Sequence, residues 1–369
     1  MSVEDRVLRM QTGNPALIQL IRSEIENHGP QSFAWFMQQA LYHPEHGYYS
    51  SGRCAIGRKG DYFTNVSVGP LFGHLLAAQF TEIWKQLGKP DDFVIVEQGA
   101  HHGQFARDVL ESLQKRAQEF FEALRYRIVE PFPVLQKRQA ELLQPFRDKT
   151  EWRDSLQPFV GIHFSNELLD AMPVRLISGD VEKLVDLEGG NFVWIEQPIQ
   201  RTAACMPPRD GAFNQTSLDW VDEVAANVQC GYVLAVDYGF SSKCQRDVQV
   251  RAQHRNLDSP FEQIGHADIT MGVYWPTIVE RARANRLHVA GFADQHHFLT
   301  GIISESLDLE SESGAKIKRE LKTLLHPEML GRAFQALALT KNVDPEAPTL
   351  AGFKFADQSG AAPLPIDPS

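Results

Sequence analysis

The amino-acid sequence predicts an α/β fold in which an open, largely parallel sheet carries helices on both faces. Two observations predict it. From residue 93 onward, apolar runs of strand length alternate with helical segments. Several of these runs also end in a carboxylate or a glycine turn. We expect strands at 93–97, 125–130, 150–153, 160–165 and 232–237, helices at 104–121 and 132–144, and two last strands at 287–292 and 333–340.

Three helices are expected before this core. Leu17, Ile21 and Ile25 have helical spacing within 15–28, which ends at a Gly-Pro stop signal. Ser32 is placed to cap a second helix at 33–42. A Gly- and Tyr-rich loop follows at 43–59, and then a long apolar helix at 70–87. Residues 1–70 are therefore predicted to form a helical and loop extension.

The alternation of strands and helices is interrupted twice within the predicted main domain, residues 71–342. A β-rich stretch at about 174–200 is expected to form a small inserted β cap. Helices are expected at 217–228 and 274–285, with a polar stretch between 239 and 266, and a helical insertion at about 295–330. The tail 343–369 is rich in Pro, Ala and Gly, which predicts poor order.

Composition limits the classes of function. The chain has 369 residues, 43% apolar and 22% charged, which is typical of a soluble globular protein. Its net charge of −11 argues against nucleic-acid binding and favours a cationic substrate. The four cysteines form no C-x-x-C pair, which indicates a reducing compartment. The sequence shows no secretory leader and no apolar run of about 18 residues, so we expect a cytoplasmic protein without a membrane span.

A glycine loop after the first core strand indicates a nucleotide-like cofactor. The loop reads Glu97-Gln98-Gly99-Ala100-His101-His102-Gly103 and leads into a helix. It lacks the dinucleotide fingerprint, because His101 and Gln104 occupy the second and third glycine positions. Glu130 ends the next strand, where an acid suits ribose hydroxyls. S-adenosylmethionine has no pyrophosphate and fits this loop better than a nicotinamide dinucleotide. The alternative is a plain β–α turn that binds nothing.

Acids also follow the third and fourth strands. Asp154, with Ser155 beside it, is placed to accept a hydrogen bond from an adenine amino group, or is a solvated loop aspartate. Asn166, Glu167 and Asp170 follow the fourth strand, where ligands of open α/β sheets bind. A carboxylate there can hold a guanidinium, which stays protonated. The alternative is a capped helix whose first-turn acids complement its dipole, and it weighs most for Asp170.

Two other patterns carry less information. The His101-His102 and His296-His297 doublets lack acids or cysteines at metal-ligand spacing, so no metal site is expected. Asp237 ends the fifth strand, where it either lines the substrate side or only turns the chain.

Together these motifs resemble the MidA-like group of class I S-adenosylmethionine-dependent methyltransferases. The resemblance covers about residues 25–339 and rests on these strings: 32–37, 41–49, 60–64, 97–103, 152–156, 166–173 and 237–239. The loop departs from the family's Gly-Pro-Gly-x-Gly, and 65–67 replaces the family's Ser-Pro-Glu. The family also has a histidine a few residues after the position of Asp268, which has no clear counterpart here. The family's mitochondrial member methylates an arginine of a respiratory complex I subunit.

The resemblance implies a seven-stranded sheet, an N-terminal extension, a cap over the substrate and a protein arginine as methyl acceptor. A small-molecule methyltransferase and a catalytically silent assembly protein are the alternatives. The predicted cofactor residues are Asp61, Thr64, Glu97, Gly99, His101, Gly103, Glu130, Asp154 and Ser155, and the predicted catalytic residues are Asn166, Glu167 and Asp170.

Overall fold

The computed structural model describes residues 12–52, 64–199, 210–241, 247–253, 255–306 and 314–359. The chain divides into two compact units. The first comprises 1–63, 170–217 and 243–272, and the second comprises 64–169, 218–242 and 273–369. The division predicted from the sequence, 1–70, 71–342 and 343–369, uses consecutive segments, whereas each compact unit combines three separate ones. The predicted division stays a prediction. Among the described residues, no helix has the length and apolarity needed to span a membrane.

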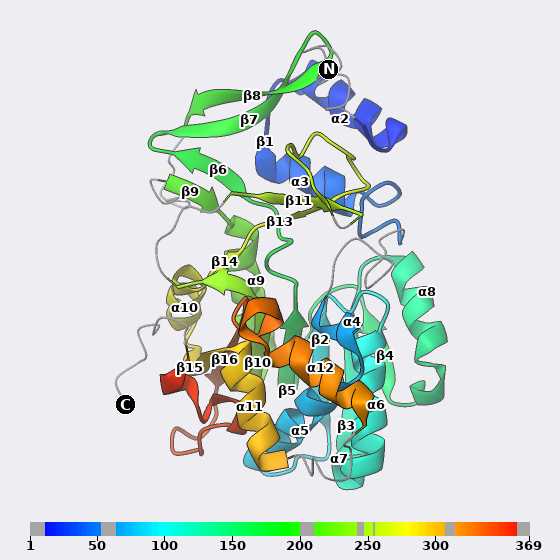
Figure 1. Ribbon diagram of the computed structural model, residues 1–369, viewed down its shortest axis with the longest axis vertical. Coiled ribbons are helices and arrows are strands. Elements are labelled where there is room, and N and C mark those ends of the chain that lie inside the picture. Colours follow the sequence, from blue (N-terminus) through cyan, green and yellow to red (C-terminus); the bar gives the residue numbers. More distant parts are fainter. Residues whose placement is uncertain are drawn as a thin grey trace. The chain divides into compact units, whose positions relative to one another are not determined.

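A twisted sheet forms the centre of the second unit (Figure 1). Seven strands follow the order β15-β16-β10-β5-β2-β3-β4, and the short β14 pairs with β10 beside this path. Strands β10, β5, β2, β3 and β4 are parallel, and β16 runs antiparallel to β10 and β15. The strands are β2 (Phe93–Gln98), β3 (Leu124–Val129), β4 (Thr150–Arg153), β5 (Phe159–Asn166), β10 (Val228–Phe240), β14 (Val273–Tyr274), β15 (His288–Asp294) and β16 (Phe334–Lys341).

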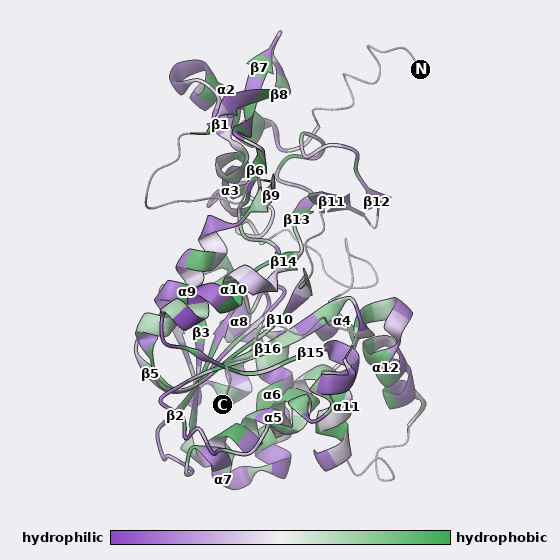
Figure 2. Ribbon diagram, turned by 90° about the vertical axis from the view of Figure 1, so that its left-hand side faces the viewer, coloured by the Kyte–Doolittle hydropathy of each residue, from purple (hydrophilic) through white to green (hydrophobic). Residues whose placement is uncertain are grey.

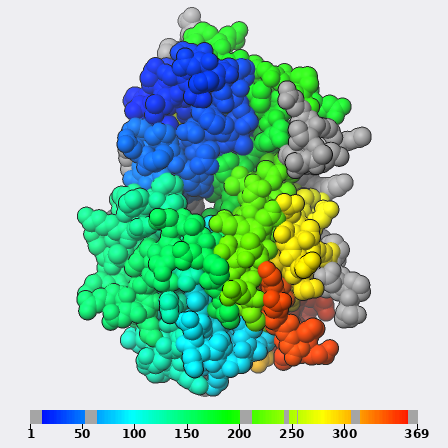
Figure 3. All heavy atoms as spheres, turned by 180° about the vertical axis from the view of Figure 1, so that it is seen from behind, coloured from blue at the N-terminus to red at the C-terminus, as the bar shows by residue number. Residues whose placement is uncertain are grey.

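Helices cover both faces of this sheet (Figure 2). On one face lie α5 (Leu71–Gln86), α6 (Gln104–Arg116) and α11 (Gln295–Ser306); on the other lie α9 (Gln215–Asn227) and α10 (Trp275–Ala284). Figure 3 shows α9 and α10 side by side on the outside, where Arg281 donates to Asp222 at 2.6 Å. The remaining helices are α4 (Asn65–Val68), α7 (Gln118–Ala123), α8 (Pro133–Leu142) and α12 (Ala315–Leu325), with short turns η1 (Gln144–Phe146) and η2 (Pro327–Gly331).

The predicted α/β class and its seven-stranded sheet are confirmed, with one difference among the helices. The helix expected over 104–121 is two helices, because Ala117 has the non-helical angles φ −142° and ψ 58°. The break turns Phe120 onto Trp84, with ring centroids 5.1 Å apart, and Phe121 toward Phe146. Both aromatic rings are buried by this break, and their burial favours the end of the first helix at this point.

In its described residues, the first unit contains the helices α2 and α3 and two antiparallel sheets. Helices α2 (Pro15–His28) and α3 (Phe33–Tyr42) have the predicted bounds. One sheet has the order β1-β7-β6-β9 with β8 beside β7, and the other has the order β12-β11-β13. The strands are β1 (Gln31–Ser32), β6 (Arg175–Ser178), β7 (Val181–Glu188), β8 (Asn191–Pro198), β9 (Asp210–Phe213), β11 (Gln249–Ala252), β12 (Arg255–Asn256) and β13 (Asp268–Thr270).

Local sequence signals explain α2. The Asn14 side chain accepts hydrogen bonds from the N–H groups of Ala16 and Leu17 at 3.1 and 3.2 Å. Pro15 follows at the first helical position, where a missing N–H costs nothing. Leu17 and Ile21 recur on one face and are buried in the core of this unit.

The inserted β segment was predicted, but its partners were not. Strands β6, β7 and β8 match the expected cap. The stretch at 239–266 was described from the sequence only as polar, with no strand assigned to it, and it contains β11 and β12. In β11 only Val250 and Ala252 are buried, so the period-two pattern covers four residues and is too short to stand out. Of the four cysteines, Cys230 alone lies among the described residues.

The described part of the tail, 343–359, is ordered, in contrast to the expectation. It forms the turns η3 (Ala351–Phe353) and η4 (Ala356–Gln358), and Leu350 and Phe353 are buried. The Phe353 ring lies 5.1 Å from the ring of Phe298 on α11, and a methyl group added at Gly291 would collide with it. Two apolar side chains thus anchor a segment whose composition resembles a loop.

We expect Phe353→Ala to lower the free energy of unfolding by about 3 kcal/mol, because it removes a buried ring and leaves a cavity. Urea denaturation measures the change. The neighbouring Lys354→Ala is the control, since it removes an exposed ion pair with Glu305 and a cation–π contact with Phe355 and should cost less than about 1 kcal/mol. Equal stability of Phe353→Ala and the wild type would show that the tail does not pack on this unit.

Candidate functional site

The glycine loop connects β2 to α6 through left-handed backbone conformations. Gly99 and Gly103 both have φ +83°, and His101 between them has φ +47°. The Gly103 N–H donates to the Ala100 carbonyl at 2.7 Å, which closes the turn before α6 begins. A Cβ atom at Gly99 would lie 3.2 Å from Leu168 Cδ1. Glycine is needed at both ends because other residues rarely adopt this φ.

The two histidines of this loop stack on one another. Their ring centroids lie 3.8 Å apart, and His102 Nε2 lies 3.1 Å from Arg138 Nη1. Burial lowers the pKa of His101 to about 3, so its imidazole is neutral at pH 7. Within the described part of the chain, His101 Nε2 is buried and has no hydrogen-bond partner. Among the described residues, the loop therefore contains a buried, neutral ring nitrogen that makes no hydrogen bond.

Glu97, predicted as a cofactor residue, lies within β2 and in the core of the second unit. Only 4% of it is exposed, and its Oε2 accepts a hydrogen bond from the Tyr126 hydroxyl of β3 at 2.8 Å. Burial raises the pKa of Glu97 to about 8, and the Tyr126 hydrogen bond opposes part of that rise. The carboxyl is thus protonated at pH 7 and joins two strands from inside.

Glu130 directly follows β3, and its carboxylate is buried. Oε1 accepts from the Phe132 N–H at 3.1 Å, and Oε2 accepts from the Gln139 amide at 3.1 Å. Burial raises the pKa of Glu130 to about 7, and the two hydrogen bonds lower it in part. This acid therefore changes its charge near neutral pH.

Two glutamines of α8 hold this region, and sequence reasoning missed both. Gln139 donates to the His101 carbonyl at 2.8 Å as well as to Glu130, and it accepts from Trp152 Nε1 at 3.0 Å. Gln136 donates to the Glu130 carbonyl at 2.6 Å and to Asp154 Oδ1 at 3.0 Å. They lie three residues apart on one helix face, and that spacing was the available signal.

Asp154 and Ser155 follow β4, as predicted, and both are exposed. The Gln136 amide bridges Asp154 and Glu130, because it donates to both the Asp154 side chain and the Glu130 carbonyl. The structure thus links the ends of β3 and β4 through α8. Leu156, the next apolar residue, is buried.

Thr64 and Asn65 make different kinds of hydrogen bond. Thr64 caps α4: its hydroxyl accepts from the Ser67 N–H at 3.0 Å, and the Ser67 hydroxyl bonds back to the Thr64 main chain. Asn65 N–H donates to Glu167 Oε1 at 3.1 Å, and Asn65 Nδ2 donates to Asn166 Oδ1 at 3.0 Å. Asp61 lies outside the described residues. Asn65, like Gln136 and Gln139, is not among the site residues predicted from the sequence.

Asn166 and Glu167 stand at the end of β5, joined by side chains. Asn166 Nδ2 donates to Glu167 Oε1 at 2.9 Å, so two amides and one carboxylate form a chain from Asn65 to Glu167. Glu167 has φ +52°, which is uncommon for a residue other than glycine. Backbone strain of this kind is frequent at functional sites.

Asp237, at the C-terminal part of β10, fixes the segment after Glu167. Its Oδ2 accepts from the N–H groups of Leu168 and Leu169 at 3.1 and 2.8 Å. Only 1% of Asp237 is exposed. The Asp237 side chain therefore holds the segment that follows Glu167 in place.

Asp170, the third predicted catalytic residue, belongs to the first unit. It is buried there, and its carbonyl accepts from the Met271 N–H at 2.8 Å. In the same unit, the Tyr49 hydroxyl donates to Asp268 Oδ1 at 2.5 Å. The structure thus joins Asn166 and Glu167 to each other and places Asp170 in a different set of contacts.

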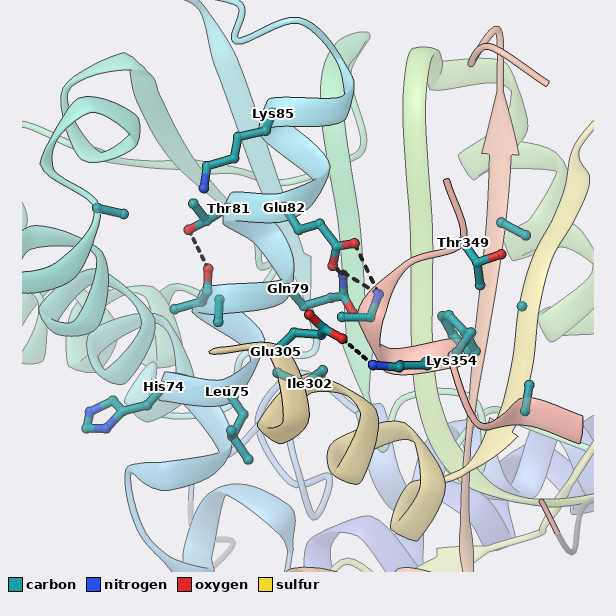
Figure 4. A pocket seen from close by; sticks show the side chains of 18 of the residues that line it. His74, Leu75, Gln79, Thr81, Glu82, Lys85, Ile302, Glu305, Thr349 and Lys354 are labelled. Atoms are coloured by element: carbon teal, nitrogen blue, oxygen red, sulfur yellow. Dashed lines mark hydrogen bonds and ion pairs between the residues drawn. The ribbon is translucent and has the colours of Figure 1, made fainter. Parts of the chain in front are cut away.

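A cavity of about 1220 Å³ lies elsewhere in the second unit (Figure 4). Its wall comes from α5, the C-terminal part of α6, β15, α11 and the tail, and the Gln79 and Glu82 side chains bond the main chain of Gly352 and Ala351. None of the described candidate residues lines it. The cavity is therefore separate from the strand-end site.

The residues of the strand-end site fit an adenosine-type cofactor in their chemistry. A buried carboxylate at Glu130 matches a pair of ribose hydroxyls, and the unpartnered His101 nitrogen can bond a polar ligand atom. Both glycines keep side chains out of the loop. An open α/β sheet with such a loop after its first core strand is the arrangement of proteins that bind nucleotide-type cofactors.

Comparison with known proteins identifies the family. Residues 75–293 match a family model described as "Putative S-adenosyl-L-methionine-dependent methyltransferase". The match covers more than half of the chain, so the protein belongs to this family. It is an S-adenosylmethionine-dependent methyltransferase with the class I fold, as the sequence predicted.

Two curated relatives span most of the chain. The protein arginine methyltransferase NDUFAF7 homolog of Drosophila melanogaster is 25% identical, covering 91% of this chain and 87% of its own length. The Danio rerio protein arginine methyltransferase NDUFAF7 is also 25% identical, covering 87% of this chain and 86% of its own length. Both are named mitochondrial. This contradicts the expectation of a cytoplasmic protein, which rested on the scattered cysteines and on the lack of a recognisable leader and of a long apolar run.

Two solved structures from Burkholderia thailandensis share the whole fold. One, described as a "likely methyl transferase" bound to S-adenosyl-homocysteine, has a TM-score of 0.82 and 26% identity, covering 96% of this chain and 98% of its own. The other, an uncharacterized protein of the same superfamily, has a TM-score of 0.78 at 24% identity with the same coverage.

Glu97→Gln should change the pH dependence of stability. The folded state holds a proton on Glu97 up to about pH 8, whereas the unfolded state releases it near pH 4.5, so wild-type stability falls as pH rises between these values. The slope from this group is up to about 1.4 kcal/mol per pH unit. Relative to wild type, the variant should gain stability from pH 5 to 8 in urea denaturation, whereas exposed Glu223→Gln should not. Parallel curves for Glu97→Gln and wild type would mean that Glu97 is ionised.

Proposed function

We propose that this enzyme transfers the methyl group to an arginine side chain of a protein. The observation that carries the proposal is the carboxylate of Glu167, oriented by the Asn65 N–H and the Asn166 amide at the end of β5. The two relatives named protein arginine methyltransferases, each matched along most of its length, support the same acceptor.

The chemistry explains why a carboxylate is needed. An arginine guanidinium stays protonated below about pH 12, and its charge is delocalised, so its nitrogen is a poor nucleophile. Glu167 binds the guanidinium through charge-assisted hydrogen bonds and fixes one nitrogen in line for displacement. It also draws positive charge away from the attacking nitrogen. As the new N–C bond forms, the bond between the methyl group and the cofactor sulfur breaks and S-adenosylhomocysteine is left. The proton of that nitrogen passes to the Glu167 carboxylate and from there to solvent.

The cofactor is proposed to lie at the ends of β2, β3 and β4. S-adenosylmethionine supplies, when bound, a methyl group on a sulfonium. The Glu130 carboxylate accepts from the ribose hydroxyls, and Asp154, with Ser155 beside it, faces the adenine amino group. Gly99 and Gly103 let the backbone approach the ligand, and His101 Nε2 bonds one of its polar atoms. Thr64 and Asp61 complete the predicted set, and Glu97 supports it from the core.

Glu167→Gln should lower the methylation rate about 10²- to 10³-fold, because the amide is uncharged and cannot hold the cation as tightly. S-adenosylhomocysteine affinity, measured by calorimetry, should stay within about three-fold, since Asn65 and Asn166 remain. Exposed Glu280→Gln is the control and should behave as wild type.

Labelled S-adenosylmethionine with a cell lysate provides the assay, followed by hydrolysis of the protein to find methylarginine. Label in small molecules would indicate a different acceptor, and no label would indicate a silent assembly protein. Equal rates for Glu167→Gln and wild type would remove Glu167 from the reaction.

Binding of S-adenosylhomocysteine should depend on pH through Glu130. The ionised carboxylate is the stronger acceptor for ribose hydroxyls, and its pKa is about 7. Affinity should therefore rise from pH 6 to 8, and below pH 7 it should fall by at most about ten-fold per unit. Calorimetry at several pH values measures this. Glu130→Gln should bind more weakly and show a flat profile, and a profile that persists in the variant would assign the titration to another group.

A further inference from the structure

The side chain of Gln139 is fully buried, and every bond of its amide has a defined direction. Indole Nε1 of Trp152 can only donate, so it must face the amide oxygen. The His101 carbonyl and the Glu130 carboxylate can accept, so both must face the amide nitrogen, whose two hydrogens they use. The three partners thus fix one orientation of the amide.

These partners come from three different strand ends. His101 belongs to the loop after β2, Glu130 follows β3, and Trp152 lies in β4, while Gln139 stands on α8. The methylene groups of Gln139 also lie beneath the loop, since a Cβ at Gly103 would be 3.4 Å from Gln139 Cγ. One buried side chain therefore connects the loop, the strand-end acid and the adjacent edge strand.

The carboxylate depends on this contact more than an exposed acid would. Glu130 is 5% exposed, and its described donors are the Phe132 N–H and the Gln139 amide. The Phe132 bond is local to the chain, two residues on, whereas the Gln139 bond ties the carboxylate to the loop. Loss of a donor from a buried charged group is costly, and it frees the group to turn.

We propose that Gln139 is a positioning residue, which holds the Glu130 carboxylate and the His101 carbonyl in one arrangement for the adenosine part of the cofactor. This inference rests on the proposed cofactor site and extends it to a helix that no motif includes. Gln139 need not touch the ligand; it acts by fixing groups that do.

Gln139→Met keeps the length and volume of the side chain but removes all three hydrogen bonds. We expect its affinity for S-adenosylhomocysteine to fall about 10- to 30-fold in calorimetry. The matched control is Gln79→Met on α5, because Gln79 is also a buried glutamine. Its amide donates to Glu82 and accepts from the Gly352 N–H, and neither partner belongs to the glycine loop. Both variants should lose stability, but only Gln139→Met should lose affinity.

The pH profile of binding gives a readout that lost stability alone would not move. The amide bond favours the ionised form of Glu130, so its removal should raise the pH at which affinity is half-maximal. The titratable and charged side chains around this contact are His101, His102, Arg138 and Asp154, and Gln139→Met leaves all four in place. Gln79→Met should keep the wild-type midpoint.

Trp152→Phe provides a second variant, should Gln139→Met fail to fold. It removes the donor that orients the amide oxygen together with part of the packed ring, and affinity should fall about three- to five-fold. If wild type binds S-adenosylhomocysteine and the folded variants bind equally well with an unchanged pH midpoint, Gln139 is not a positioning residue and the cofactor proposal stands. If wild type does not bind, the cofactor site itself is wrong and the inference falls with it.

Discussion

The parallel register of β5, β2, β3 and β4 is the constraint on which the candidate site depends. Ser165 pairs with Gln98, Gln98 with Val129, and Val129 with Arg153, so one row of residues crosses all four strands. The residues that directly follow this row in the four strands β5, β2, β3 and β4 are Asn166, Gly99, Glu130 and Asp154, respectively. If one strand were shifted by a single residue, its side chains would turn to the opposite face of the sheet. Its strand-end residue would then no longer lie beside those of the neighbouring strands.

Neutral groups, rather than cations, satisfy the buried acids of this region. The donors to Glu97 and Glu130 are a phenol, a main-chain N–H and an amide. Neutral donors only partly offset the loss of hydration, which is why the pKa values of both carboxyls are raised. Burial is the larger cause for both carboxyls, and the hydrogen bonds oppose it. Among the described residues, Glu97 has one such donor and Glu130 has two. A strand interior thus keeps a neutral acid, whereas a strand end keeps one that ionises near pH 7.

Sequence patterns predicted the sheet and the row of strand-end residues, because apolar runs and the residues after them are local features. They missed Gln139 and Gln136, whose importance comes from which strand ends α8 packs against. Glu97 shows a related limit: an acid in the last positions of a strand can point to the ligand side or to Tyr126 in the core, and the sequence does not decide between them. The order of Phe353 depends in the same way on distant partners, Gly291 and Phe298.

The left-handed conformation of Glu167 is imposed by the neighbouring strand. Val236 pairs with Asn166, so Asp237 stands beside the turn and its carboxylate takes the N–H groups of Leu168 and Leu169. Two hydrogen bonds to a buried carboxylate offset the roughly 1–2 kcal/mol that a non-glycine residue needs at this φ. An extended Glu167 would carry Leu168 and Leu169 away from Asp237, leaving that carboxylate buried without these donors. The fold therefore stabilises the backbone turn that presents the Glu167 side chain to Asn65 and Asn166, and the strain is a consequence of sheet register rather than of the acid itself.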